Sequence, residues 1–272
     1  MFRRISALLG AVAVGSVLVG LVAAPAAAAP DCPDLHWIGV AGSGERDGDP
    51  TVNGGMGRVV YQSLSDISRL VQQDGRTLTA EAVDYPAAPV PADGDLLGWG
   101  GFMHSVDTGV AALGNQYAAF VQQCPNTKVV LAGYSQGAMV VHRNLHALAA
   151  SPNLAAALLV ADGDRLPNDA TLNLGTATAL PDAGKGVAQD WPTLSHAPAP
   201  LPVFIGSRTI SVCDRGDAVC DYDEDADEVT ATAIAIHTSY ATGRTSGLRW
   251  TWPLYQLLRP APSQGQLVPA GS

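Results

Sequence analysis

The five residues Gly133-Tyr134-Ser135-Gln136-Gly137 constrain the fold of this chain more than any other segment. They follow the apolar run Val129–Ala132 and precede a helix-like run that starts at Ala138. A strand, a Gly-x-Ser-x-Gly turn and a helix in this order form a nucleophile elbow, with the serine at the apex of a tight turn. We therefore predict that Ser135 projects above a sheet, beside the unpaired N–H groups that begin the next helix.

Apolar runs and helix-like segments alternate along the rest of the chain. Strands are expected at 35–40, 77–83, 129–132 and 202–205, with 154–161 as a strand or a helix followed by a strand, and helices at 58–72, 107–123, 138–145 and 249–258. This alternation predicts an α/β fold with a mainly parallel sheet covered by helices on both faces. Residues 166–200 lack periodicity and are expected to form a long connection.

The N-terminal segment has the features of a secretory signal peptide. Arg3 and Arg4 precede the apolar run Ile5–Ala24, and alanines follow where cleavage would occur. The run is also long enough for a membrane anchor, but its alanine-rich exit and the lack of a charged stop favour cleavage after Ala28. We expect a signal peptide at 1–28, one domain over 29–260, a flexible tail at 261–272, and no stable membrane insertion after cleavage.

The chain is strongly acidic. Its formal charge is −10, and removing Arg3 and Arg4 lowers it to −12. Such a charge disfavours nucleic acids and anionic membrane surfaces as partners. Alternating acids from Asp221 to Asp227 faintly resemble a calcium loop, but the glycine and terminal glutamate of an EF-hand are missing. We expect a solvated loop there and no metal.

Four cysteines are informative in an exported protein, because disulfides persist outside the cytosol. They allow three pairings. The nearest-neighbour choice joins Cys213 to Cys220 and leaves Cys32 for Cys124. The short bridge would then stiffen the loop that it encloses.

A serine nucleophile needs a histidine base, and six histidines are available. We expect His36 to be buried in the first strand, and His104 and His196 to lie in loops. His142 and His146 lie four residues apart on the helix after the elbow, a spacing that could hold zinc. Since no third ligand is apparent, we expect both to be exposed helix residues.

His237 fits the base best, because the order serine, acid, histidine is typical of α/β-hydrolases. Asp217, between Cys213 and Cys220, is the preferred acid, since a disulfide loop would hold it rigidly. Composition does not separate Asp217 from its acidic neighbours, Asp214 and Asp221. Two more acids compete with it at the end of the strand after the elbow: Asp162 and Asp164.

Several motifs resemble those of one family. The segment from Cys124 to Ala138 resembles the nucleophile motif of cutinases, and 213–220, with Gly-Asp-x-Val-Cys, resembles their second signature. His237, followed by an aromatic residue three positions later, is similar to their histidine segment. The loop Gly42-Ser43-Gly44-Glu45 matches the one after their first strand. The resemblance spans nearly all of the chain after the signal segment.

The resemblance implies an α/β-hydrolase fold of cutinase type, without a large lid. It places the family's long disulfide at Cys32 and Cys124. It implies an oxyanion hole formed by the backbone N–H groups of Ser43 and Gln136, with the Ser43 hydroxyl as a further donor. Ala41 departs from the family, which often has arginine there, so the loop is expected to be braced differently.

The resemblance also implies a function. Ser135 would attack an ester carbonyl, His237 would take its proton, and Asp217 would orient the histidine. The expected protein is a secreted, monomeric serine esterase without cofactor, either free or retained at the cell wall. It would act on short- to medium-chain esters, polyesters or lipids. Alternatives are a phospholipase, thioesterase or acyltransferase with the same triad, or a non-catalytic surface protein on the same scaffold.

Overall fold

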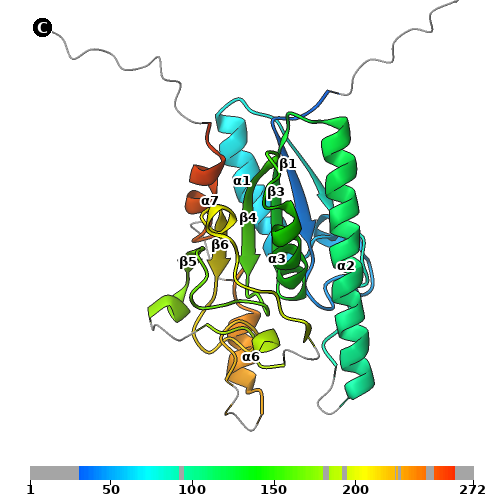
Figure 1. The fold of residues 1–272 in the computed structure, drawn as a ribbon, viewed down its shortest axis with the longest axis vertical. Helices are drawn as coiled ribbons and strands as arrows, with labels where there is room; N and C mark the ends of the chain where they lie inside the picture. The colour runs from blue at the N-terminus through cyan, green and yellow to red at the C-terminus, as the bar shows by residue number, and fades with distance from the viewer. Residues whose placement is uncertain are drawn as a thin grey trace, which may run out of the picture. The chain divides into compact units, whose positions relative to one another are not determined.

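The computed structural model describes residues 31–91, 95–179, 184–191, 195–223, 225, 228–242 and 248–260. A six-stranded sheet with strand order β2-β1-β3-β4-β6-β5 lies at its centre (Figure 1). The strands are β1 (Leu35–Val40), β2 (Leu78–Ala82), β3 (Lys128–Tyr134), β4 (Leu154–Val160), β5 (Leu172–Leu174) and β6 (Thr209–Val212). All neighbouring strands are parallel, so the predicted sheet type is confirmed.

Helices cover both faces of the sheet (Figure 1). The α-helices are α1 (Arg58–Gln73), α2 (Leu96–Gln123), α3 (Gln136–Leu148), α5 (Val203–Gly206), α6 (Ala231–His237) and α7 (Thr251–Leu258). Short 3-10 turns are η1 (Val52–Gly55), η2 (Thr176–Ala179) and η3 (Val187–Gln189). Helices α1 and α7 share one apolar cluster with the sheet, and α2 and α3 share the other.

The central strands are mostly apolar because each packs against helices on both sides. In β1, Leu35 and Trp37 join the cluster of α1 and α7, whereas Ile38 and Val40 join that of α2 and α3. All four side chains are fully buried. Such burial contributes roughly 1.5–3 kcal/mol per large side chain. For a buried parallel strand, a nearly continuous run of apolar residues is therefore a better sequence signal than a strict alternation of apolar and polar residues.

The strand order indicates where on the sheet a ligand-binding site is expected. From β1 the chain moves outward to β2, and from β3 it moves the other way to β4 and β6. The loops after β1 and β3 therefore diverge at the carboxyl ends of these two strands. In open α/β sheets, ligands bind at this kind of switch point. Ser135 follows β3 directly, and the loop of Ser43 follows β1.

Three expectations about the elements were wrong. Residues 202–205 form the start of α5 rather than a strand, and β6 follows at Thr209–Val212. The strand at this place in the sheet lies between β4 and β5 and forms hydrogen bonds on both sides. Pro202 has no N–H to donate to such bonds, so the strand begins only after α5. Helix α2 begins at Leu96, before the predicted 107, because Asp95 caps it by accepting a hydrogen bond from Gly98 N. The connection 166–200 also contains β5, η2 and η3.

Both predicted disulfides are present in the structure. Cys32 is bonded to Cys124, with 5.5 Å between their Cα atoms, and Cys213 to Cys220, with 5.9 Å. Among the described residues, no helix combines the length and apolar character that crossing a bilayer requires. The expected signal peptide and tail lie outside the described residues, and the domain limits stay a prediction.

Candidate active site

Ser135 forms the turn between β3 and α3. Its backbone has φ 54° and ψ −121°, a region that few residues other than glycine adopt. A Cβ atom at Gly133 would lie 2.2 Å from the carbonyl oxygen of Gly137, and one at Gly137 would lie 2.3 Å from that of Val40. The two glycines are therefore required by close backbone approach, and the turn has the geometry of a nucleophile elbow.

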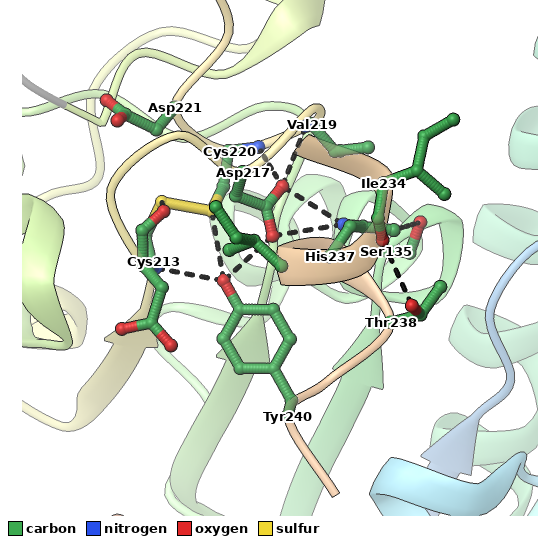
Figure 2. Close-up of polar contacts among 12 residues, drawn as sticks. Ser135, Cys213, Asp217, Val219, Cys220, Asp221, Ile234, His237, Thr238 and Tyr240 are labelled. Atoms are coloured by element: carbon green, nitrogen blue, oxygen red, sulfur yellow. Dashed lines mark hydrogen bonds and ion pairs between the residues drawn. A yellow bond between two sulfur atoms is a disulfide. The ribbon is translucent and has the colours of Figure 1, made fainter. Parts of the chain in front are cut away.

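Three side chains from separate segments meet at this turn (Figure 2). The Nε2 atom of His237 lies 3.0 Å from Ser135 Oγ, and its Nδ1 atom lies 3.0 and 3.1 Å from the two oxygens of Asp217. Because an ionised carboxylate can only accept, Nδ1 carries a proton and Nε2 directs its lone pair at the serine hydroxyl. The arrangement can therefore accept the serine proton.

His237 is the last residue of α6, and the elbow holds it directly. The Tyr134 hydroxyl donates to the carbonyl oxygen of His237 at 2.7 Å, and the two rings are stacked with centroids 5.2 Å apart. The helix itself begins with Thr230, whose side chain accepts from Ala233 N. The His237 side chain remains 14% exposed, so the imidazole is accessible from solvent.

Asp217 is fully buried inside the loop closed by the Cys213–Cys220 disulfide. Its Oδ1 atom accepts hydrogen bonds from Val219 N at 2.7 Å and Cys220 N at 3.0 Å. These two bonds and the disulfide hold the carboxylate in place next to His237.

The predicted oxyanion residues converge on one carbonyl group. The Ser43 hydroxyl donates to Ala88 O at 2.5 Å, and Gln136 Nε2 donates to the same oxygen at 3.3 Å. The Gln136 side chain also accepts from Ser105 Oγ at 3.2 Å. Gln136 is the first residue of α3, so its backbone N–H has no partner within the helix. The Ser43 hydroxyl donates to Ala88 O in this structure, and its role as a further oxyanion donor stays a prediction.

The loop after β1 is braced by two residues whose role the sequence did not reveal. Glu45 accepts hydrogen bonds from Gly42 N at 2.7 Å and from Arg58 N at 2.9 Å. The Tyr85 hydroxyl donates to Ala41 O at 2.5 Å, and burial raises the pKa of Tyr85, so it remains a donor. These contacts brace the loop at Ala41, as expected without the arginine that the resemblance implied there.

Comparison with known proteins identifies the family. The family model described as Cutinase matches residues 31–251. The chain belongs to the cutinase family. Cutinase CUT1 of Coprinopsis cinerea is 26% identical over 220 residues, which cover 80% of this chain and 82% of that protein. Phospholipase Culp4 of Mycobacterium tuberculosis is 30% identical over 219 residues, which cover 80% of each chain.

Solved structures agree on the fold. A cutinase-like protein from Cryptococcus sp. superposes with a TM-score of 0.56 at 19% identity, covering 85% of this chain and 94% of that one. An acetylxylan esterase superposes with a TM-score of 0.55 at 21% identity, covering 84% and 97%. The predicted α/β-hydrolase fold of cutinase type is therefore confirmed.

Membership in the cutinase family makes this protein a carboxylic ester hydrolase that acts on ester substrates. Cutinases of fungi and bacteria are secreted, and two disulfides fit an extracellular protein.

The two competing acids of this cutinase have other partners than His237. Asp162 Oδ2 lies 2.6 Å from His142 Nδ1, and Asp164 forms an ion pair with Arg143 at 2.7 Å. His142 is only 1% exposed, so its expected exposure was wrong. Burial lowers the pKa of His142, but Asp162 and the neighbouring carboxylates Asp164 and Asp169 outweigh it, and the net shift is upward.

The other histidine predictions had mixed outcomes. His36 is buried as expected, with its ring nitrogens 2.9 Å from Thr79 Oγ1 and Glu81 Oε1. His104 lies within α2 rather than in a loop, and His196 lies in a loop as expected. Within the described ranges, no group of three or more potential ligands is arranged to hold a metal ion.

The acidic neighbours of Asp217 also have other partners. Asp214 pairs with Arg249 at 2.7 Å, and Asp221 accepts from Gly216 N at 2.7 Å. Although partial burial opposes it, Arg249 lowers the pKa of Asp214. Geometry therefore distinguishes Asp217 from its neighbours, which composition could not do. Part of the acidic run, including Asp227, lies outside the described residues.

Proposed function

We propose that this cutinase is a secreted serine esterase that hydrolyses short- to medium-chain carboxylic esters through Ser135, His237 and Asp217. One observation supports it most: His237 lies 3.0 Å from the Ser135 hydroxyl through Nε2 while its Nδ1 faces the buried Asp217. This alignment leaves one side of the imidazole free to move a proton and keeps the other side fixed.

The geometry supports a two-step reaction. As Ser135 Oγ bonds to the ester carbonyl carbon, His237 Nε2 takes its proton and Asp217 stabilises the imidazolium. The carbonyl oxygen becomes an oxyanion, for which Gln136 N and Ser43 N are the proposed donors, each typically contributing about 2.7–4 kcal/mol. His237 then protonates the leaving alcohol. In the second step, His237 takes a proton from water as the water oxygen bonds to the acyl carbon. The bond between that carbon and Ser135 Oγ then breaks, His237 returns the proton to Oγ, and the acid is released.

Exposed apolar side chains on elements of the site support an ester with an apolar acyl group. Ile234, one helical turn before His237, is 51% exposed. Leu97, in the first turn of α2, is 90% exposed, and the same helix supplies Ser105 to Gln136. Exposed apolar side chains on the elements that carry a polar site suit substrates such as acyl esters or polyesters.

The nucleophile can be tested by covalent labelling. A fluorophosphonate should modify Ser135, as mapped on the labelled peptide, and Ser135→Ala should lose both labelling and hydrolysis of p-nitrophenyl butyrate. Ser65→Ala is a matched control, because Ser65 is a helix serine that bonds only to Tyr61 O among the described residues. Labelling elsewhere, or full activity of Ser135→Ala, would refute the assignment.

A second candidate is a phospholipase, with thioesterase or acyltransferase activity as further variants of the same chemistry. The relative Culp4, named a phospholipase, favours this possibility. Rates on a chain-length series of p-nitrophenyl esters, a polyester film, a phospholipid and an acyl thioester would separate these substrates. If no ester is turned over and no fluorophosphonate is bound, a non-catalytic surface protein is the remaining reading.

A further inference from the structure

Tyr240 connects the histidine segment to the disulfide loop. Its hydroxyl lies 2.8 Å from Asp217 Oδ2 (Figure 2). The same hydroxyl lies 2.9 Å from Asp214 N. Its side chain is almost completely buried, at 3% exposure. It lies three residues after His237, so one short segment contacts Asp217 through both the imidazole and the phenol.

The direction of the Tyr240 proton follows from its neighbours. A backbone N–H can only donate, so the phenol oxygen accepts from Asp214 N. Its single proton is then available for Asp217 Oδ2, which as part of a carboxylate can only accept. Burial and the charge of Asp217 raise the pKa of Tyr240, so the phenol stays protonated.

The two oxygens of Asp217 are held in different ways. Oδ1 accepts from two backbone N–H groups in addition to His237, those of Val219 and Cys220. Oδ2 accepts from Tyr240 and His237, and the part of the chain that the structure describes offers it no other donor. Without the phenol proton, Oδ2 would have only the imidazole to hold it, and a buried acceptor would be left short of partners.

The phenol ring is fixed by its surroundings. It packs near Tyr134 and Trp250, with ring centroids 6.3 and 6.5 Å away. The Arg249 guanidinium lies 5.6 Å from its centroid and is itself paired with Asp214. A ring held on several sides directs its hydroxyl to one place, which a positioning group requires.

We propose that Tyr240 is a positioning residue for the esterase reaction: its hydroxyl, oriented by Asp214 N, holds Asp217 in line with His237. This inference rests on the proposed function, since it needs His237 as the base. Asp217 must stay ionised and fixed in place at the moment when His237 becomes an imidazolium. The Tyr240 bond supplies that constraint on the oxygen that the backbone does not reach.

The direct test is Tyr240→Phe, which removes only the hydroxyl. With p-nitrophenyl butyrate, we expect kcat to fall about 10- to 100-fold with KM nearly unchanged, as for loss of a hydrogen bond to a charged group. The pH at which kcat/KM falls on the acid side should rise, because the carboxylate–imidazole pair would bind a proton more tightly. A change in stability alone would not move this limb.

Tyr255→Phe is the matched control. The Tyr255 hydroxyl donates to Asp74 at 2.5 Å. The variant therefore removes another tyrosine–aspartate hydrogen bond, at the end of α1 that lies far from the site. We expect wild-type kcat and an unchanged pH profile for this variant. If Tyr240→Phe behaved in the same way, the proposal would be wrong.

Replacing Tyr240 with a fluorinated tyrosine provides a second test that keeps the hydroxyl and almost the same ring. A more acidic phenol donates more strongly, so the acid limb should move to lower pH, opposite to the phenylalanine variant. An unchanged limb in the folded fluorinated protein would overturn the proposal even if Tyr240→Phe did not fold. Full activity of Ser135→Ala would instead refute the proposed function, and these two failures are distinguishable.

Discussion

Two histidine–aspartate pairs in this cutinase have the same contact and different surroundings. His237 Nδ1 lies 3.0 Å from Asp217, and His142 Nδ1 lies 2.6 Å from Asp162. Nε2 of His237 faces the Ser135 hydroxyl at 3.0 Å, whereas Nε2 of His142 is buried without a hydrogen-bond partner among the described residues. The comparison teaches that the group at the second nitrogen, rather than the pair itself, indicates catalysis.

Helix geometry explains why His142 does not serve Ser135. It lies seven residues beyond Ser135 on α3, about two turns or 10 Å along the axis. Its ring contacts Asp162, which follows β4, instead of Ser135. His237, far away in sequence, reaches Ser135 because α6 ends above the elbow.

The largest expected difference between the two pairs is in activity. His237→Ala should lower kcat/KM for p-nitrophenyl butyrate by at least about 10⁴-fold, as for the loss of a triad histidine. His142→Ala should lower it less than about 10-fold in protein that remains folded, because His142 contacts no reacting atom. Circular dichroism of both variants controls for folding. Comparable losses of activity would contradict the division of roles.

For stability, the His142 variant should show the larger effect and the His237 variant the smaller one. His142→Ala should reduce the free energy of unfolding by about 3–5 kcal/mol, because it leaves Asp162 buried with one oxygen unpaired. His237→Ala should cost less than about 1 kcal/mol, since Asp217 keeps the bonds from Val219 N and Cys220 N. Urea unfolding measures both. The double variant His142→Leu/Asp162→Asn should recover part of the loss, and no recovery would argue against an unpaired charge as its cause.

The two disulfides extend the comparison. Of the two histidine–aspartate pairs, only His237–Asp217 has its aspartate inside a disulfide loop. Replacing both cysteines of Cys32–Cys124 by serine should cost roughly 4–5 kcal/mol, since it closes a long loop. Replacing both of Cys213–Cys220 should cost only roughly 2–3 kcal/mol. It should nevertheless lower kcat more, because Asp217 lies on that loop. If both variants lost the same factor in kcat for each degree by which their melting temperature fell, this prediction would be refuted.

Sequence patterns predicted the elements that carry strong local signals. The Gly-x-Ser-x-Gly turn, the cysteine loop around Asp217 and the position of His237 each have a recognisable neighbourhood. The histidines on α3 do not, because nine residues of that helix are buried, including Gln136 and Asn144 as well as apolar ones. Its buried face is too wide for spacing to separate inside from outside. The exposure of His142 was therefore predicted wrongly.

Contacts between distant segments could not be read from the sequence either. Tyr85 and Tyr240 act through hydroxyls that reach backbone or carboxylate groups on other loops, and no spacing rule joins them. Residues 202–205 misled in another way, since an apolar run looks like a strand even when its first residue is a proline. Packing between elements decides such cases.

The smallest predicted effect is the pH dependence of stability, which compares His142 with its helix neighbour His146. The pKa of His142 is raised, despite burial, by Asp162 and the nearby Asp164 and Asp169. Burial and the charge of His142 lower the pKa of His146, while Asp169 and a backbone contact at Ala199 oppose this. Arg143 faces the same cluster through Asp164.

The signs are opposite for the two histidines. A raised folded pKa means that the contribution of His142 is fully present below about pH 6.5 and is lost as pH rises through the folded value. A lowered folded pKa means that the contribution of His146 is present above about pH 6.5 and is lost as pH falls below it. Each proton changes the unfolding free energy by at most about 1.4 kcal/mol per pH unit.

Urea unfolding from pH 5 to 9 measures both contributions. His142→Gln should flatten the decline of the unfolding free energy on the alkaline side, and His146→Gln should flatten only the decline on the acid side. The same slope change in both variants would show that the two imidazoles share one environment, against the assignment of His142 alone to the carboxylate cluster.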